Sequence, residues 1–190
     1  MTNIPENLRR ECADYALHAY GTAYIFEKRA ANIQNKIRIL SFLGVAVPAC
    51  VGAVVGSYSL DSKQTGVILT IASTIALVQL LLSIWSLASG WDAKLSEYLD
   101  QKNKNYEISD KYKKLGNDTV HDLHAYKREQ EKLDIERSYI KKAADKHSVT
   151  ENEKRKGMRY ALRKFQRSCA SCGIVPTDMK STDCGVCGQL

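Results

Sequence analysis

Two long stretches without a charged side chain limit what this chain can fold into. They cover residues 39–60 and 64–91, and are 22 and 28 residues long. A helix of about 20 apolar residues crosses the roughly 30 Å hydrocarbon core of a bilayer. The sequence therefore predicts a transmembrane hairpin over residues 39–91, with spans at 39–60 and 65–90.

Apolar runs of this kind have two alternative interpretations. A pair of buried core helices is one alternative, but the length of the runs and their occurring twice favour membrane spans. A cleaved signal peptide is the other. It is disfavoured because 38 residues with six basic and four acidic side chains precede the first run.

The short connection between the runs determines the expected topology. Only residues 61–64 join them, so the spans must be antiparallel and both termini must lie on the same side. Basic residues near the spans mark the cytoplasmic side of a membrane. Those flanking the hairpin are Lys28, Arg29, Lys36, Arg38, Lys94, Lys102 and Lys104. Because the loop holds only Lys63, we expect both termini in the cytoplasm.

The C-terminal tail, residues 168–190, holds four of the six cysteines as two C-x-x-C pairs separated by eleven residues. The four are Cys169, Cys172, Cys184 and Cys187. Glycine follows three of them and permits the positive φ of tight turns. Two pairs of thiolates on tight turns supply the closed tetrahedral shell of a structural zinc site. We therefore predict that the tail binds Zn²⁺ and resembles a zinc ribbon, with a short hairpin between the two cysteine pairs whose turn begins at Pro176.

Iron and disulfides are the alternatives for these four cysteines. A four-thiolate shell suits iron as well as zinc, whereas disulfides are rare on the reducing side of a membrane. The tail has little apolar surface to bury, so metal binding would supply its folding free energy. Cys12 and Cys50 lie on apolar helical stretches, where we expect them to pack as small apolar residues.

The remaining segments read as cytoplasmic helices and complete an all-α membrane protein. Residues 1–38 form an amphipathic N-terminal helix, and residues 92–149 a cytoplasmic helical region. Thr150 and Glu153 have the spacing of a capping box, which predicts a helix over residues 150–167.

That last helix is densely basic. Its cations are Lys154, Arg155, Lys156, Arg159, Arg163, Lys164 and Arg167. Residues 150–190 carry a net charge of +4, out of +7 for the whole chain. Such a segment can bind anionic lipid or nucleic-acid phosphates, or form a solvated helix face.

Each expected span has a distinctive face. Gly44, Pro48, Gly52 and Gly56 recur every four residues in the first, which favours close packing on another helix. Gln79, Ser83 and Ser86 recur at helical spacing in the second. A polar stripe at membrane depth indicates either hydrogen-bonded packing within the hairpin and between copies, or the lining of a pore.

The sequence contains no recognisable catalytic motif. Its four histidines, His18, His121, His124 and His147, form no ligand pattern with carboxylates, and no phosphate-binding glycine loop or nucleophile elbow is present. We expect a protein that is not an enzyme.

The order of an amphipathic helix, a two-span hairpin and long charged helices resembles the SLATT domain. The spacing of Cys169, Cys172, Cys184 and Cys187 is similar to that of a mobile-element-associated CxxCx(11)CxxC subgroup. The resemblance implies an oligomeric effector in the bacterial inner membrane that perturbs the bilayer during antiphage defence. It implies no catalytic residues, and a separate sensor or activating protein, since no sensor domain is evident.

A second hypothesis is a membrane-anchored binding module, whose tail and basic helix recruit nucleic acid or a protein. A subunit of a transport complex is a weaker third hypothesis.

Overall fold

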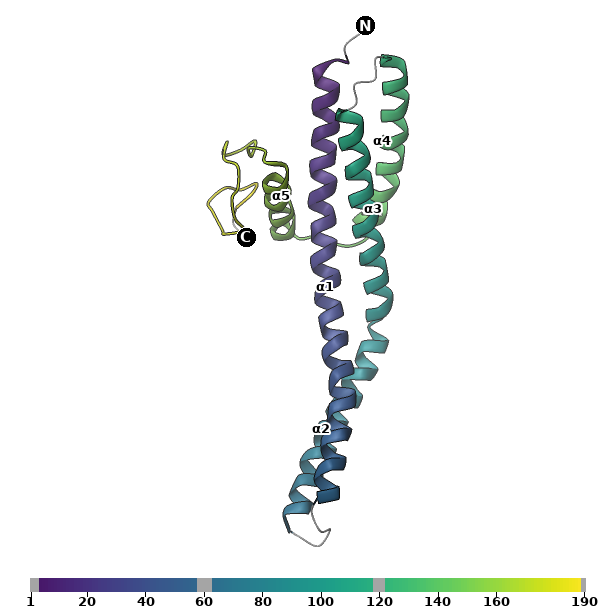
Figure 1. The fold of residues 1–190 in the computed structure, drawn as a ribbon, viewed down its shortest axis with the longest axis vertical. Coiled ribbons are helices and arrows are strands. Elements are labelled where there is room, and N and C mark those ends of the chain that lie inside the picture. Colours follow the sequence, from purple (N-terminus) through teal and green to yellow (C-terminus); the bar gives the residue numbers. More distant parts are fainter. Residues whose placement is uncertain (1–3, 58–62, 118–121, 189–190) are drawn as a thin grey trace. The chain divides into compact units, whose positions relative to one another are not determined.

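The computed structural model describes residues 4–57, 63–117 and 122–188. Within these residues the secondary structure is helical, without strands. The five helices are α1 (Glu6–Ser57), α2 (Lys63–Ala88), α3 (Trp91–Asn117), α4 (Leu123–Asp145) and α5 (Glu151–Phe165) (Figure 1). The tail after α5 consists of turns and irregular backbone.

The chain divides into two compact units. Unit 1 comprises Met1–Arg29 with Glu97–Leu190, and unit 2 comprises Ala30–Ser96. The boundaries fall inside α1 and α3, so each of these helices contributes residues to both units.

The core of unit 1 is built where α1, α3 and α4 pack together. Its buried residues are Ile4, Cys12, Ala16, Ala19, Ile108, Tyr112, Leu115, Tyr126, Leu133 and Ile140. Tyr112 and Tyr126 are among the largest side chains that are fully buried. Small residues on α1 face large ones on α3 and α4, so the helices can approach while the tyrosine rings fill the space between them.

Several polar groups inside this core are paired. The Tyr112 hydroxyl donates to Asp134 at 2.6 Å, and the Ser109 hydroxyl donates to the Ala16 carbonyl at 2.7 Å. The Tyr126 hydroxyl lies 3.2 Å from the sulfur of Cys12. Cys12 is thus a buried core residue, as the sequence predicts, and burial raises the pKa of its thiol.

Helix α5 packs against α1 on a different face from α3 and α4 (Figure 1). The backbones approach at Gly21 and Gly157. A Cβ on Gly157 would lie 2.6 Å from the Gly21 carbonyl oxygen, so no larger residue fits without moving the helices. Tyr160 of α5 stacks on Tyr24 of α1 with 4.0 Å between ring centroids.

The start of α5 confirms the predicted capping box. The Thr150 hydroxyl accepts from the Glu153 N–H at 3.3 Å, and the Glu153 carboxylate accepts from the Thr150 N–H at 2.9 Å. The end differs from the expected residue 167, because Gln166 adopts a left-handed conformation with φ 50° and closes the helix after Phe165.

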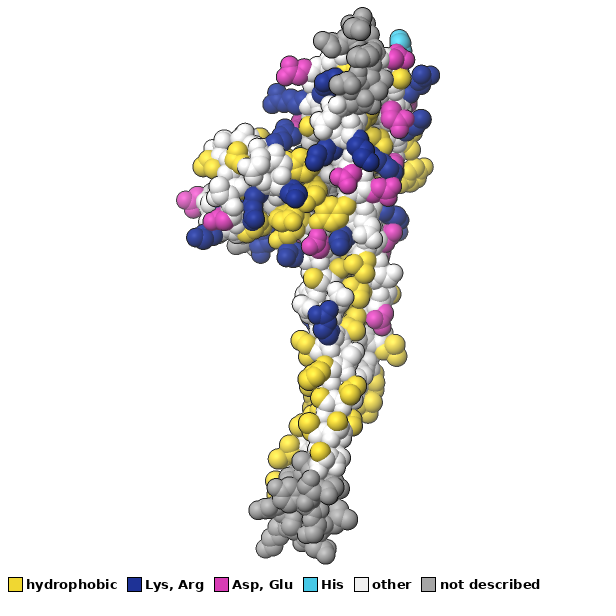
Figure 2. All heavy atoms as spheres, viewed as in Figure 1, with side chains coloured by type: hydrophobic (Ala, Val, Ile, Leu, Met, Phe, Trp, Pro, Cys, Tyr) yellow, Lys and Arg dark blue, Asp and Glu magenta, His cyan; other side chains and the backbone are white. Residues whose placement is uncertain are grey.

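Unit 2 contains the apolar part of α1 and all of α2. No break separates the expected N-terminal helix from the expected first span, because α1 continues through Pro48 to Ser57. Both helices contain stretches long and apolar enough to cross a membrane. None of the residues in those apolar windows is buried, and hydrophobic side chains cover the visible face there (Figure 2).

Candidate metal centre

The four cysteines of the tail converge on one point. Their sulfur atoms all lie within 4.8 Å of one another. The sulfurs of Cys169 and Cys184 are 3.9 Å apart, and those of Cys172 and Cys187 are 3.8 Å apart. Each short distance therefore joins one C-x-x-C pair to the other, and the eleven residues between the pairs bring the two turns together.

Each pair lies on a turn closed by the same backbone hydrogen bond. The Gly173 N–H donates to the Cys169 carbonyl, and the Gly188 N–H donates to the Cys184 carbonyl, both at 2.8 Å. The first turn is also held by a 3.0 Å bond from the Cys169 N–H to the carbonyl of Ile174. Because the two turns are alike, both cysteines of each pair can face the same centre.

The glycines in these turns have different roles. Gly173 has the positive φ, 72°, that the sequence analysis expected after a cysteine, but Gly185 and Gly188 do not. At Gly188 the reason is space, since a Cβ would lie 2.8 Å from the Cys184 carbonyl oxygen. The hairpin expected between the cysteine pairs, with its turn beginning at Pro176, is not observed as paired strands in the part of the tail that the structure describes. Asp178 instead accepts from the Lys180 N–H at 3.0 Å in a tight turn.

The sulfur geometry fits a tetrahedral metal ion. A Zn–S distance of about 2.3 Å gives about 3.8 Å between sulfurs at the corners of a tetrahedron. The two short distances of 3.8 and 3.9 Å match this value, and both greatly exceed the roughly 2.05 Å of a disulfide. The tail is therefore arranged as a metal-binding site rather than as two disulfides. Four thiolates at these distances accept zinc or iron, so the donor set leaves the metal's identity open.

The environment favours a thiolate at one of the ligands. Backbone N–H groups of Cys187 and Val186 lower the pKa of Cys184 to about 6. Burial raises the pKa of Cys187. Of these two cysteines, Cys184 thus loses its proton more readily, and it is also the less buried.

A buried arginine of α5 lies against the metal-binding tail. Arg159 has a side chain only 6% exposed, and its guanidinium donates to the Asp178 carbonyl at 2.8 Å and to the Cys187 carbonyl at 3.1 Å. It also forms an ion pair with the Asp178 carboxylate at 3.1 Å. Arg159 is therefore not part of an anion-binding face, which corrects the sequence analysis. Its donors are used within the protein.

The other basic residues of this segment differ in their surroundings. Arg167 pairs with Asp14 of α1 at 2.7 Å, and Lys154 pairs with Glu151 at 2.7 Å on the surface. Arg155 is half-buried and has an interaction partner. Lys156, Arg163 and Lys164 are exposed, so these three remain the candidates for binding an anion.

Two of the metal-binding cysteines belong to a hydrophobic cluster shared with α1 and α5. Cys169 and Cys187 are each 2% exposed and pack with Leu17, Ala161 and Leu162. The candidate metal site thus packs against α5 and also contacts α1 at Leu17. Sequence analysis missed this contact because the tail has few apolar residues other than its cysteines.

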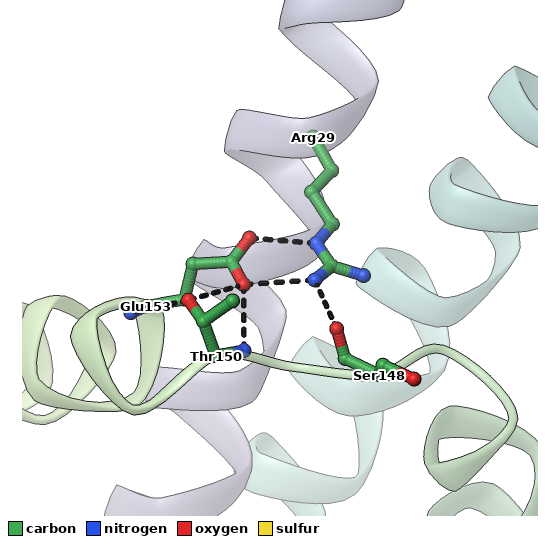
Figure 3. Close-up of polar contacts among 4 residues, drawn as sticks. All are labelled: Arg29, Ser148, Thr150 and Glu153. Carbon is green, nitrogen blue, oxygen red and sulfur yellow. Dashed lines mark hydrogen bonds and ion pairs between the residues drawn. The ribbon is translucent and has the colours of Figure 1, made fainter.

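At its other end, α5 is held by Arg29 of α1 (Figure 3). The guanidinium binds both carboxylate oxygens of Glu153, at 2.7 and 2.8 Å, and also donates to the Ser148 carbonyl at 2.8 Å. These bonds from Arg29 lower the pKa of Glu153 to about 2. Glu153 therefore serves both the capping box and a bidentate ion pair.

In unit 2, the structure joins two faces that the sequence analysis treated separately. A Cβ on Gly44 would lie 3.1 Å from the side-chain nitrogen of Gln79, so Gly44 of α1 makes room for this polar group of α2. Gly52 has open space around it. Pro48 is exposed on α1, and the side chain position of Gly56 lies outside the residues described.

The hydroxyls of α2 bond to their own helix. Ser83 donates to the Gln79 carbonyl at 2.9 Å, and Thr70 and Thr74 make the same kind of bond four residues back. Ser86 is half-buried. Nearby, Cys50 is exposed and lines an apolar groove of about 330 Å³ between α1 and α2.

The histidines do not form a second candidate site among the residues described. His147 packs edge-on against Phe26 and Tyr98, and its Nε2 lies 3.1 Å from a Glu97 oxygen. The four cysteines are the group of metal-ligating side chains that converges in the described part of the chain. His121 lies outside that part.

A family model described as "Mobilome CxxCx(11)CxxC protein" matches residues 9–190. The match covers both the helices and the tail. No curated protein and no solved structure matches the chain.

Proposed function

The chain belongs to the mobilome CxxCx(11)CxxC family, and from this membership we propose that it is a two-span membrane effector of mobile elements. In this proposal the apolar hairpin of unit 2 inserts into the bacterial inner membrane, with both termini in the cytoplasm. The four-cysteine tail holds Zn²⁺. Copies of the chain assemble and permeabilise the membrane in mobile-element or antiphage defence, in response to a separate sensor protein.

The observation that carries the proposal is the exposure of large apolar side chains in unit 2. Four of them are 65–82% exposed, namely Phe42, Val45, Trp85 and Leu87. The windows expected to cross a membrane are 0% buried within the chain, which favours membrane spans over buried core helices. Leaving this much apolar surface in water is unfavourable, whereas lipid accommodates it.

Polar contacts in unit 2 are also suited to a membrane. The hydroxyls of Thr70, Thr74 and Ser83 in α2 donate to carbonyls of the same helix, which lowers the cost of placing them in lipid. At the end of the apolar region, the Lys36 ammonium lies 5.7 Å from the centroid of the Trp91 ring. Tryptophan and lysine are typical of the membrane–water interface, so this pair supports a bilayer boundary near residues 36 and 91.

Assembly of several copies is supported by features that the single chain leaves unused. Gly52 faces open space, and the apolar groove between α1 and α2 has no side chain filling it. Close packing of helices in lipid relies on small residues and shape rather than on the hydrophobic effect. A second copy can therefore pack against α1 at Gly52 while Gln79 of the same chain stays beside Gly44.

The test is to induce the full-length chain in bacteria and follow growth and membrane potential. We expect induction to depolarise the membrane and arrest growth. A matched control replaces residues 39–91 with an unrelated two-span hairpin and keeps the rest of the chain. The effector proposal requires the native hairpin, so depolarisation by the control would contradict it.

One observation favours a second function, a membrane-anchored module that binds nucleic acid or a protein. Ile174 and Val186, which lie in the two cysteine turns, are 65% and 43% exposed. Lys156, Arg163 and Lys164 on α5 are exposed as well. If this module is the function, the hairpin-swap control retains activity, and binding of the partner depends on these side chains.

A further inference from the structure

Helix α5 is held between α1 and the tail. On one side, Gly157 meets Gly21 of α1 so closely that a Cβ would lie 2.6 Å from the Gly21 carbonyl oxygen. On the other, Arg159 reaches into the tail. Since these two residues are separated by a single position, the same turn of α5 contacts both neighbours.

The burial of Arg159 depends on the folded tail. Its side chain is 6% exposed, and it donates hydrogen bonds to groups of the tail, namely the carbonyls of Asp178 and Cys187 and the side chains of Asp178 and Thr182. A buried guanidinium without partners is strongly unfavourable. If the tail unfolds, the Arg159 guanidinium loses these partners and becomes exposed to water, so α5 loses its polar contacts with the tail.

The tail itself depends on the metal site. Its buried apolar contacts with α1 and α5 come through Cys169 and Cys187, which pack with Leu17 and Leu162. Four thiolates around a divalent ion carry a net charge of −2, and Arg159, which donates to the Cys187 carbonyl, places a positive charge beside it. Outer residues of this kind orient metal ligands and affect metal affinity.

From these contacts we propose that metal binding in the tail keeps α5 docked on α1, and that Arg159 is the positioning residue that couples the two. The inference rests on the proposed metal occupancy of the tail. Helix α5 has 15 residues, a length at which an isolated helix is marginal in water. Without the tail, α5 keeps its contacts with α1 at Glu153, Gly157 and Tyr160 but loses the packing of Cys169 and Cys187 on Leu162. We therefore expect the turns from Gly157 onward to open and fray more often.

The experiment is amide hydrogen exchange, read by mass spectrometry, on full-length protein in detergent. Zinc-loaded protein is compared with protein stripped by a chelator, and zinc per chain is measured on the same samples. We expect stripping to speed exchange of the amides of residues 157–165 at least tenfold. Amides of α3 and α4, which contact α1 on a different face, should keep their protection.

Three variants separate coupling from simple unfolding. Arg159→Gln should weaken zinc affinity about 10–100-fold and speed exchange in α5 even when zinc is bound. Asp178→Ala removes one partner of Arg159 without altering α5, and should give a smaller change in the same direction. Lys164→Gln removes an exposed charge from the same helix and should behave as the unaltered protein. Protection of α3 and α4 reports whether each variant is folded.

The outcomes distinguish the coupling from the metal proposal. Zinc well below one per chain in the unaltered protein would contradict metal binding by the tail. One zinc per chain with equal exchange of α5 before and after stripping would contradict the coupling and leave metal binding intact. Equal exchange in Arg159→Gln and Lys164→Gln would remove Arg159 from its proposed role.

Discussion

Several contacts of this protein depend on positions where a side chain is missing. Gly157 lets α5 touch the backbone of α1, Gly44 makes room for Gln79, and Gly188 allows the second cysteine turn to close. At each of these positions a Cβ would come within 3.1 Å of another residue's atom. At the candidate metal site, by contrast, four side chains converge from two similar turns.

Replacing one cysteine should remove the metal. Cys172→Ser or Cys184→Ser leaves three thiolates, and a closed structural site with three strong ligands binds zinc far more weakly. We expect zinc, measured by elemental analysis of purified protein, to fall from about one per chain to a small fraction. The matched control is Cys50→Ser, which removes an exposed thiol outside the tail. Full zinc in a Cys172→Ser, Cys184→Ser double variant would place the site elsewhere.

The Arg29–Glu153 pair should give a pH-dependent contribution to stability. Arg29 lowers the pKa of Glu153 to about 2 from its ordinary value of 4.5. A carboxyl with a depressed pKa in the folded state stabilises above the unfolded pKa, and this contribution is lost as pH falls from about 4.5 to 2. At neutral pH the contribution is about 1–3 kcal/mol.

The measurement is the thermal midpoint of the unaltered protein and of Glu153→Gln between pH 7 and pH 2. The unaltered protein should be more stable at pH 7, and the difference should shrink below pH 4.5. Both proteins share the tail, so its own response to acid cancels in the difference. A difference that stayed constant down to pH 2 would rule out the ion pair as its source.

At the scale of elements, helices that are apolar or densely charged were easier to predict than their contacts. The capping box of α5 and the cysteine turns involve residues a few positions apart, so their spacing is visible in the sequence. The partner of Gly157 is Gly21, far away in the chain, and no local pattern marks it. The available signal for this contact was a glycine inside an otherwise helical segment. Such a glycine lowers helix stability, so its presence often indicates close packing against another element.

Arg159 shows the same limit in another form. In the sequence it is one of seven cations on a basic helix, and its neighbours give no reason to separate it from the others. Its partners are 19 to 28 residues further along, in a tail whose fold depends on metal geometry rather than on a hydrophobic pattern. The metal ligands could therefore be predicted, whereas the residue that anchors them to α5 could not.

The hairpin should respond differently to a larger side chain at Gly44 and at Gly52, both of which lie on α1. Gly44→Leu places a side chain where Gln79 lies, so it should disturb the packing of α1 on α2 within one chain. Gly52→Leu adds bulk where the chain has open space, so it should leave the hairpin intact and reduce assembly of copies. Cross-linking in membranes measures assembly, and protease resistance of the inserted hairpin measures its packing. Normal assembly of Gly52→Leu would exclude this face as the contact between copies.

At the scale of the whole molecule, the two units are stabilised in different ways. Unit 1 has a buried core, paired polar groups and a candidate metal site, whereas unit 2 leaves its apolar side chains exposed. A single sequence thus combines a part that buries its apolar side chains with a part that leaves them exposed. The sequence alone indicated this division, because charged residues are absent from residues 39–60 and 64–91.

The proposed topology can be measured on intact cells. A membrane-impermeant maleimide should label Ser62→Cys, in a background without other reactive cysteines, because the loop is expected outside. Reporters fused at either end of the chain should report a cytoplasmic location. Labelling of Ser62→Cys only after lysis would contradict the hairpin topology, and labelling of Ser168→Cys after lysis alone serves as the matched control for the cytoplasmic side.

The order of synthesis gives the α1–α5 contact a further consequence. Ribosomes add about 5–20 residues per second, so on the order of ten seconds separate the appearance of Gly21 from that of Gly157. Once α4 has been synthesised, the nascent chain can assemble α1, α3 and α4, whose buried core includes no residue of α5 or the tail, although Phe165 later packs against it. The face of α1 around Leu17 stays uncovered meanwhile. Docking of α5 can therefore follow the assembly of the other helices, and the proposed coupling predicts that a cell short of metal would accumulate chains in which α5 is not stably docked.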